Sequence, residues 1–182
     1  MNIYFTASIV GKKHYLQNYL KIIEILKKEN HKIIYEHIID SKMEEVDLQT
    51  EEKRKVFHQK LKNWIMEADC VVVETSFPSI SVGFEISLAL NLGKRVLILY
   101  TKDAPTLLSS YENERLICSK YRYEDLKETL DEFINYVRGK SEHRFTFFIN
   151  SRIAHFLEQI SRKKRIPKSV YIRSLIEKEM KA

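Results

Sequence analysis

The sequence predicts an α/β protein: a parallel sheet with helices on both faces, followed by a small basic module of different architecture. Over the first 138 residues, short apolar runs alternate with longer segments of helical periodicity. Such alternation is typical of strand–helix–strand units with parallel strands. Residues 139–143 form a short polar linker, and residues 144–182 follow another order, one strand and then two helices. We therefore expect two domains, 1–138 and 144–182.

Five strands and four helices are expected in the first domain. The segment 70–75, CVVVET, is a continuous apolar run, which is typical of a strand buried on both faces. Segment 15–29 places apolar side chains at helical spacing with lysines between them. The strands are expected at 2–8, 31–37, 70–75, 95–100 and 115–121. The helices are expected at 15–29, within 44–67, and at 81–92 and 123–137.

The positive charge is concentrated in the last 39 residues. The chain has a net charge of +6, and residues 144–182 contain ten Lys or Arg but only three Glu. The first 143 residues are therefore close to neutral. This asymmetry indicates a polyanionic partner for the tail, and the alternative is a solvated basic surface without a partner.

The sequence also predicts a cytoplasmic protein. The start, MNIYFTASIV, lacks the basic region and long apolar stretch of a signal peptide. No run approaches the ~18 apolar residues that a membrane span needs, so we expect no membrane partner. Cys70 and Cys118 lie in apolar runs, where reduced core thiols are expected.

The segment 75–85 is the strongest candidate for a functional site. It follows the most apolar strand and opens a helix, and ligands of parallel sheets bind beyond the carboxyl ends of the strands. Gly83 and small hydroxyl residues allow close approach, and free amides at a helix start favour an anion. Glu85 near the positive helix end should stay ionised, and an ionised carboxylate can attack an anomeric carbon. The alternative is that the serines cap the helix and Glu85 is an ordinary first-turn acid.

Several short motifs carry a resemblance to a known family. In order along the chain they are Ile3-Tyr4-Phe5-Thr6-Ala7-Ser8-Ile9, Glu36-His37, Asn63-Trp64, Ala68-Asp69, Pro78-Ser79, Val82-Gly83-Phe84-Glu85 and Gly93-Lys94. Together they resemble the nucleoside 2-deoxyribosyltransferase superfamily, in particular its deoxynucleoside-monophosphate N-glycosidase branch. The resemblance covers roughly residues 1–138, and VGFE is its most specific part. With the strand–helix alternation, it indicates a flavodoxin- or Rossmann-like sheet.

The resemblance implies a substrate and a set of site residues. The substrate would be a nucleoside or nucleoside 5′-monophosphate, with no metal and no other cofactor. Glu85 would be the nucleophile that takes the sugar from the base, and Tyr4 would lie near the sugar and this Glu. Ser8 and Ser79 would sit by the 5′-phosphate, and Ser109 would reach the phosphate held by a neighbouring subunit. The residues expected at the substrate or its phosphate are Ser8, Gly11, Ser79, Gly83 and Ser109.

Two positions depart from the family pattern. Leu61 stands where the family has an Asp that gives a proton to the leaving base, and leucine cannot do so. Val10 stands where the glycosidase branch has an Arg, although Lys12 and Lys13 follow closely.

Three interpretations of Leu61 remain open. Another group, such as His58 or His37, supplies the proton; the substrate has a base that leaves without one; or the pocket binds without turnover. His58 lies about one helical turn before Leu61 and could share its face, but the preferred interpretation is a solvated helix histidine.

The tail resembles the ribbon-helix-helix family over its whole length. Residues 144–150 are expected to form a strand, Asn150 or Ser151 to cap a first helix, and a second helix to begin at residue 167 or 168. In this family two chains pair their strands into a ribbon that enters the DNA major groove. The residues expected at DNA are Arg144, Thr146 and Phe148 on the ribbon and Lys168 and Ser169 at the second helix start. Phe148 is apolar, whereas the family usually has a polar side chain that contacts the bases at this position. The alternative is that the tail only joins two chains and does not bind DNA.

The sequence thus leaves three functions open. The chain is an N-glycosidic hydrolase or transferase fused to a DNA-binding dimeriser, a non-catalytic nucleotide-sensing regulator, or a structural dimer with a vestigial pocket. Glu85 favours the enzyme, whereas Leu61 favours the sensor. Each of them implies a homodimer or a larger even-numbered assembly.

Overall fold

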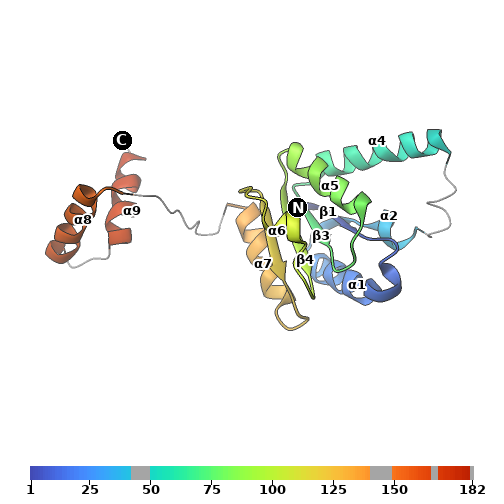
Figure 1. The fold of residues 1–182 in the computed structure, drawn as a ribbon, viewed down its shortest axis with the longest axis horizontal. Helices are drawn as coiled ribbons and strands as arrows, with labels where there is room; N and C mark the ends of the chain where they lie inside the picture. Colours follow the sequence, from blue (N-terminus) through green and yellow to red (C-terminus); the bar gives the residue numbers. More distant parts are fainter. Residues whose placement is uncertain (42–49, 140–148, 165–167, 181–182) are drawn as a thin grey trace. The chain divides into compact units, whose positions relative to one another are not determined.

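The computed structural model describes residues 1–41, 50–139, 149–164 and 168–180 (Figure 1). The chain divides into two compact units, Met1–Glu142 and His143–Ala182. No helix in these described ranges is both long enough and apolar enough to cross a membrane.

The first unit contains a five-stranded parallel sheet in the order β2-β1-β3-β4-β5. The strands are β1 (Asn2–Ala7), β2 (Lys32–Ile34), β3 (Cys70–Glu74), β4 (Arg95–Tyr100) and β5 (Leu116–Lys120). This confirms the expected parallel α/β sheet. Because β1 pairs with both β2 and β3, the order of strands reverses at β1, and ligands of such sheets bind where the order reverses.

Helices cover both faces of this sheet, as expected (Figure 1). The first face packs against α1 (Lys12–Lys28) and α7 (Leu126–Val137), and the second against α4 (Glu51–Glu67) and α5 (Ile80–Asn91). Strand side chains alternate between the faces. Ile3 and Phe5 therefore join the apolar cluster of α1 and α7, whereas Tyr4 joins that of α4 and α5.

The expected strand 31–37 is wrong in its second half. β2 ends at Ile34 and is followed by the short helix α2 (Glu36–Ile39). β2 is an edge strand with one neighbour, so few ladder hydrogen bonds hold the chain extended there. The Lys12 ammonium group also donates to the carbonyls of Ile39 and Ser41 and so fixes the end of α2.

Two smaller differences concern helix positions. α1 begins at Lys12, three residues before the expected start, and a short helix α6 (Thr106–Ser109) was not expected. The remaining strands and helices agree with the expected positions to within a few residues.

The second unit contains α8 (Ser151–Lys164) and α9 (Lys168–Glu179), both as expected. The Asn150 side chain accepts a hydrogen bond from the Ile153 amide at 3.0 Å, so Asn150 is a cap of α8. The rings of Phe156 and Tyr171 lie 6.4 Å apart and join the two helices. Arg144, Thr146 and Phe148, expected on the ribbon, lie outside the described residues.

Candidate active site

A buried hydrogen-bonded pair, Tyr4 and Glu85, lies where the strand order reverses. Tyr4 comes from β1 and Glu85 from α5, and the Tyr4 hydroxyl donates to Glu85 Oε2 at 2.9 Å. Glu85 is only 7% exposed. It lies in the second turn of α5, so it is not an ordinary first-turn acid on a solvated helix end.

Burial dominates the electrostatics of this pair. Desolvation raises the pKa of Glu85 to about 7, against the opposing effect of the Thr6 and Tyr4 hydroxyls. Burial therefore opposes the ionised form that the position near the start of the helix was expected to favour. Burial and the neighbouring carboxylate raise the pKa of Tyr4 far above its usual value, so Tyr4 remains a hydrogen-bond donor. The Thr6 hydroxyl is buried and has no hydrogen bond of good geometry within the described ranges.

His37 from α2 extends the pair to three residues. Its Nε2 lies 2.9 Å from the Tyr4 hydroxyl, and the two rings are stacked with centroids 4.9 Å apart. Burial lowers the pKa of His37 to about 4, so the ring is neutral. Because the single hydroxyl proton of Tyr4 goes to Glu85, the network assigns the His37 proton to Nε2. Nδ1 is then an acceptor, and it is buried without a partner among the described residues.

Leu61 is buried in the same apolar cluster as Tyr4 and Val82, so the place of the usual acid is occupied by hydrocarbon. His58 lies on the exposed side of α4, with its ring 5.5 Å from that of Phe84. Of the two histidines considered for the missing acid, His37 is the one in hydrogen-bond contact with the Tyr4–Glu85 pair.

The loop after β1 brings together Ser8, Gly11 and Lys12. The Ser8 hydroxyl is buried and accepts a hydrogen bond from the Gly11 amide at 3.1 Å. A Cβ atom at Gly11 would lie 2.6 Å from the Tyr19 hydroxyl oxygen and 2.7 Å from Phe77 Cβ, so only glycine fits there. Lys12 is engaged with the end of α2, and the next residue, Lys13, is exposed.

A cleft of about 410 Å³ lies beside the start of α5. Ser79 caps the helix by accepting from the Val82 amide at 3.5 Å, and a methyl group on Gly83 would meet no atom within 4 Å. Gly83 is therefore not required by crowding, although it lines the cleft. The residues that line the cleft are Thr75, Ser76, Phe77, Pro78, Ser79, Val82, Gly83, Ile86, Lys102, Asp103, Pro105 and Leu108.

Ser109 is not brought to this cleft. It is exposed on α6, next to the lining residue Leu108, and its hydroxyl donates to the Thr106 carbonyl at 3.1 Å. Its predicted role depends on a second subunit and stays a prediction.

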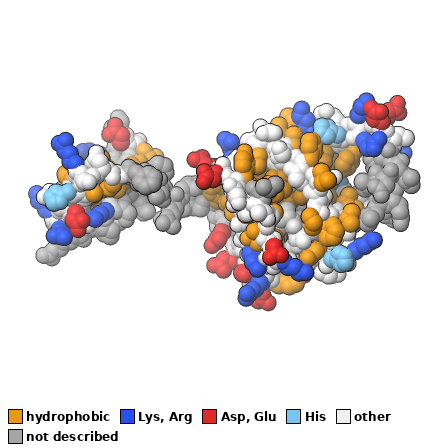
Figure 2. Space-filling view, in the orientation of Figure 1, with side chains coloured by type: hydrophobic (Ala, Val, Ile, Leu, Met, Phe, Trp, Pro, Cys, Tyr) orange, Lys and Arg blue, Asp and Glu red, His pale blue; other side chains and the backbone are white. Residues whose placement is uncertain are grey.

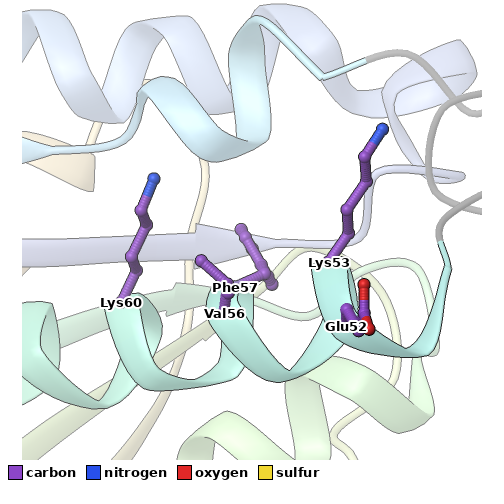
Figure 3. Close-up of a pocket in the computed structure, with 5 residues that line it drawn as sticks. All are labelled: Glu52, Lys53, Val56, Phe57 and Lys60. Atoms are coloured by element: carbon purple, nitrogen blue, oxygen red, sulfur yellow. The ribbon is translucent and has the colours of Figure 1, made fainter.

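A second cavity, of about 370 Å³, lies along α4 (Figure 3). In Figure 3, Lys53 and Lys60 project from α4 on either side of Phe57, and Glu52 and Val56 complete the lining. None of the residues predicted for the substrate lines this cavity. Across the described part of the chain, no group of three or more His, Cys, Asp or Glu side chains is placed to hold a metal ion.

Glu74 is a further residue of interest, which the motifs of the sequence did not single out. It is fully buried at the end of β3. The signal was an acid inside the apolar run CVVVE.

In the second unit, Lys168 is exposed and lies 3.2 Å from Glu158, which also pairs with Arg162 at 3.3 Å. Both cations lower the pKa of Glu158. Part of the basic surface is therefore paired within the unit. Ser169 lies in the first turn of α9.

Comparison with family models gives two matches. The model described as nucleoside 2-deoxyribosyltransferase matches residues 3–146, and the ribbon-helix-helix domain model matches residues 143–178.

Curated relatives resemble the first of these regions. The chain is 31% identical over 109 residues to the 5-hydroxymethyl-dUMP N-hydrolase of Rattus norvegicus. The aligned region covers 60% of this chain and 66% of that protein. It is 31% identical over 136 residues to a putative 2′-deoxynucleoside 5′-phosphate N-hydrolase 1 of Nematostella vectensis, covering 72% of this chain and 92% of the relative.

Solved structures share the fold. A Clostridium botulinum CMP N-glycosidase aligns with a TM-score of 0.50 at 14% identity, over 72% of this chain and 99% of the other. A 2-deoxyribosyltransferase from Bacillus psychrosaccharolyticus aligns with a TM-score of 0.51 at 14% identity, over 70% and 90%.

Proposed function

This chain belongs to the nucleoside 2-deoxyribosyltransferase family, and from that membership we propose that it breaks the N-glycosidic bond of a nucleoside 5′-monophosphate with Glu85 as the nucleophile. The observation that carries the proposal is the buried hydrogen bond from the Tyr4 hydroxyl to Glu85 Oε2. Relatives whose names specify deoxynucleoside 5′-phosphate N-hydrolases favour a deoxyribose substrate.

In the proposed reaction, Glu85 attacks C1′ of the sugar while the bond from C1′ to the base nitrogen breaks. The base leaves with the bonding electron pair, and the sugar phosphate becomes an ester of Glu85. Tyr4 holds Oε2, which leaves Oε1 as the attacking atom. Water then hydrolyses the ester, or a second base takes the sugar in a transfer reaction.

Leu61 cannot give a proton to the leaving base. The hydrogen bonds of the neutral His37 ring and the Tyr4 hydroxyl run toward Glu85, so these groups donate to the nucleophile and not to the base. With a high pKa for Tyr4 and a neutral His37, neither group is a strong acid at neutral pH. We therefore expect the fastest turnover with bases that leave readily as anions.

Two serine hydroxyls support binding of the substrate phosphate. Ser8 and Ser79 each accept a hydrogen bond from a backbone amide, so each retains its own proton to donate to a phosphate oxygen. The positive start of α5 adds to this attraction. Gly83 would leave room for the phosphate, Gly11 would place its loop by packing closely against Tyr19 and Phe77, and Ser109 of a second subunit would complete the contact.

For the second unit we propose DNA binding by a homodimer. The described helices expose apolar side chains that a pair of short helices cannot bury alone, and a second copy would cover them. These side chains are Ile153, Phe156, Leu175, Ile176 and Met180. In this dimer Arg144, Thr146 and Phe148 would face the bases, and Lys168 and Ser169 would contact phosphates.

The experiment is a time course of free base release from a panel of nucleosides and 5′-monophosphates, followed by liquid chromatography. Wild type is compared with Glu85→Gln, which keeps the shape and removes the nucleophile. Release by wild type that vanishes in Glu85→Gln supports the enzyme, whereas equal release by both variants contradicts Glu85 as the nucleophile.

Leu61 favours a second candidate function, a nucleotide sensor that regulates DNA binding. In that case wild type binds a nucleotide in titration calorimetry without releasing base, and the nucleotide changes its affinity for DNA. Base release from any nucleotide in the panel would rule out the purely sensory function.

A further inference from the structure

Glu74, the last residue of β3, is a second buried carboxylate, on the sheet face opposite Glu85. It is 0% exposed, and its Oε1 accepts from the Ser76 amide at 3.3 Å, from the Ser76 hydroxyl, and from the Tyr121 hydroxyl at 3.2 Å. Its Oε2 has no partner within the described ranges. A buried carboxyl group with one unpartnered oxygen lowers stability relative to a well-packed apolar side chain, so its place in a central strand indicates a task.

On one side, the hydrogen bonds run in one direction toward Glu74. Because Tyr121 gives its only hydroxyl proton to Glu74, it accepts from Asn18 Nδ2 at 2.8 Å. Asn18 Oδ1 in turn accepts from the Tyr123 hydroxyl at 3.0 Å. This branch attaches Glu74 to α1 and to the segment after β5.

On the other side, Glu74 joins the two loops that follow β3 and β4. Ser76 gives its hydroxyl proton to Glu74, so the Ser76 oxygen accepts both the Thr101 amide and the Thr101 hydroxyl, each at 2.9 Å. Both segments line the 410 Å³ cleft and are its two walls here: Ser79 and Gly83 belong to the wall formed after β3 by the loop and the start of α5, and Lys102 belongs to the wall after β4.

We propose that Glu74 is a positioning residue that fixes the two walls of this cleft and thereby sets the affinity for the substrate phosphate. The inference rests on the proposed function, because it takes Ser79 as a phosphate ligand. Glu74 does not line the cleft itself, and its network contains neither Glu85 nor Tyr4. Its loss therefore changes phosphate recognition and leaves the chemical step intact.

The test compares kcat/KM for a 5′-monophosphate with kcat/KM for the corresponding nucleoside. In Glu74→Leu, which removes the acceptor, this ratio falls about tenfold or more, through KM of the monophosphate. Glu74→Gln keeps an acceptor oxygen in the place of Oε1 and puts its amide at the unpartnered position, so it retains the ratio. Tyr121→Phe is the matched control, because it removes a hydrogen bond to Glu74 and leaves the loops joined.

A second variant keeps the test valid if Glu74→Leu does not fold. Thr101→Val removes only the hydroxyl link between the loops, and the ratio falls in the same direction. A folded Glu74→Leu with an unchanged ratio overturns the proposal, and so does an equal loss of kcat for both substrates.

Failure of the proposed function is distinguishable from failure of this inference. If wild type releases no base, the same ratio is measured as dissociation constants for the two ligands by calorimetry. If wild type prefers the monophosphate and Glu74→Leu abolishes this preference, the positioning role is supported even though the protein does not catalyse base release. Equal affinity of wild type for both ligands overturns it.

Discussion

At Glu85, burial and hydrogen bonding act in opposite directions on one carboxyl group. Desolvation raises its pKa to about 7, whereas the Tyr4 hydroxyl stabilises the charged form. The residue types were predictable from the sequence, since Tyr4 and Glu85 stand in motifs. The contact of His37 with Tyr4 was not, because residues 33 positions apart meet only through the path of α2.

Tyr4→Phe tests the hydrogen bond to Glu85. The variant loses a charge-assisted hydrogen bond in a buried site, which is worth about 1.5–3 kcal/mol. We expect kcat for base release to fall by roughly 10- to 100-fold, with KM changed less. Tyr19→Phe, which alters a buried hydroxyl outside the pair, is the control, and an equal loss in both variants would contradict a specific role for Tyr4.

Leu61→Asp restores the side chain that the family uses as general acid. General acid help is typically worth about 10²- to 10⁴-fold, so base release should rise in a variant that is otherwise slightly less stable. Leu61→Asn has similar size without an ionisable proton and should give no such gain. A fall in rate with Leu61→Asp in a folded protein would show that the apolar side chain is needed for turnover.

The pH dependence follows from the raised pKa of Glu85. The nucleophile must be ionised, so kcat/KM should rise as pH increases through about 7. Because the Tyr4 hydroxyl lowers the pKa of Glu85, the rise in kcat/KM should occur at higher pH in Tyr4→Phe. A profile that is flat between pH 5 and pH 8 would contradict Glu85 as the titrating nucleophile.

Stability should have the opposite pH dependence. The pKa values of both Glu74 and Glu85 are raised from 4.5 to about 7, so the folded state favours their neutral forms. The free energy of unfolding should therefore decrease as pH rises from about 4.5 to about 7, by about 3 kcal/mol for each carboxyl. Chemical denaturation of wild type and Glu74→Gln between pH 4.5 and pH 7 measures this free energy. The same change of unfolding free energy with pH in both proteins would contradict the raised pKa of Glu74.

At the scale of elements, the strands with long apolar runs were predictable from the sequence, whereas the short helices α2 and α6 were not. The continuous runs of β3 and β4 admit no other assignment, because both their faces are buried. The segment 31–37 has the short apolar centre of a strand, yet at the sheet edge its second half forms α2. The four-residue α6 has too little periodicity to be recognised.

Two glycines near the site should respond differently to substitution. Gly11→Ala places a methyl group within 3 Å of Tyr19 and Phe77, and such overpacking typically costs about 1–3 kcal/mol. Gly83→Ala places a methyl group in open space within a helix and should not destabilise. Thermal unfolding of both variants measures the difference. Equal melting temperatures would contradict the close approach of Gly11 to Tyr19 and Phe77.

At the scale of the whole molecule, a first unit with a net charge close to zero is followed by a second unit with a net positive charge. Charge counting alone predicted this division, because charge density depends on composition and not on packing. The exposed surface is mixed, with hydrophobic side chains among charged ones on the face that Figure 2 shows.

Charge pairing within the module predicts opposite effects of two substitutions on DNA affinity. Lys168→Ala would remove the proposed phosphate contact, so binding should weaken for all DNA sequences and the salt dependence should decrease by about one counterion. Glu158→Gln releases Lys168 and Arg162 from their pairing and should strengthen binding. Fluorescence anisotropy at several salt concentrations measures both, and a gain in affinity with Lys168→Ala would contradict the proposed contact.

The most direct test of the account is to trap the sugar on Glu85. A nucleoside 5′-monophosphate analogue with fluorine at C2′ slows breakdown of the ester, and the quenched protein is analysed by intact mass and peptide mapping. If Glu85 is the nucleophile, the peptide that contains it gains the mass of the sugar phosphate, and Glu85→Gln shows no such gain. Base release without this adduct, or an adduct on another residue, would contradict it.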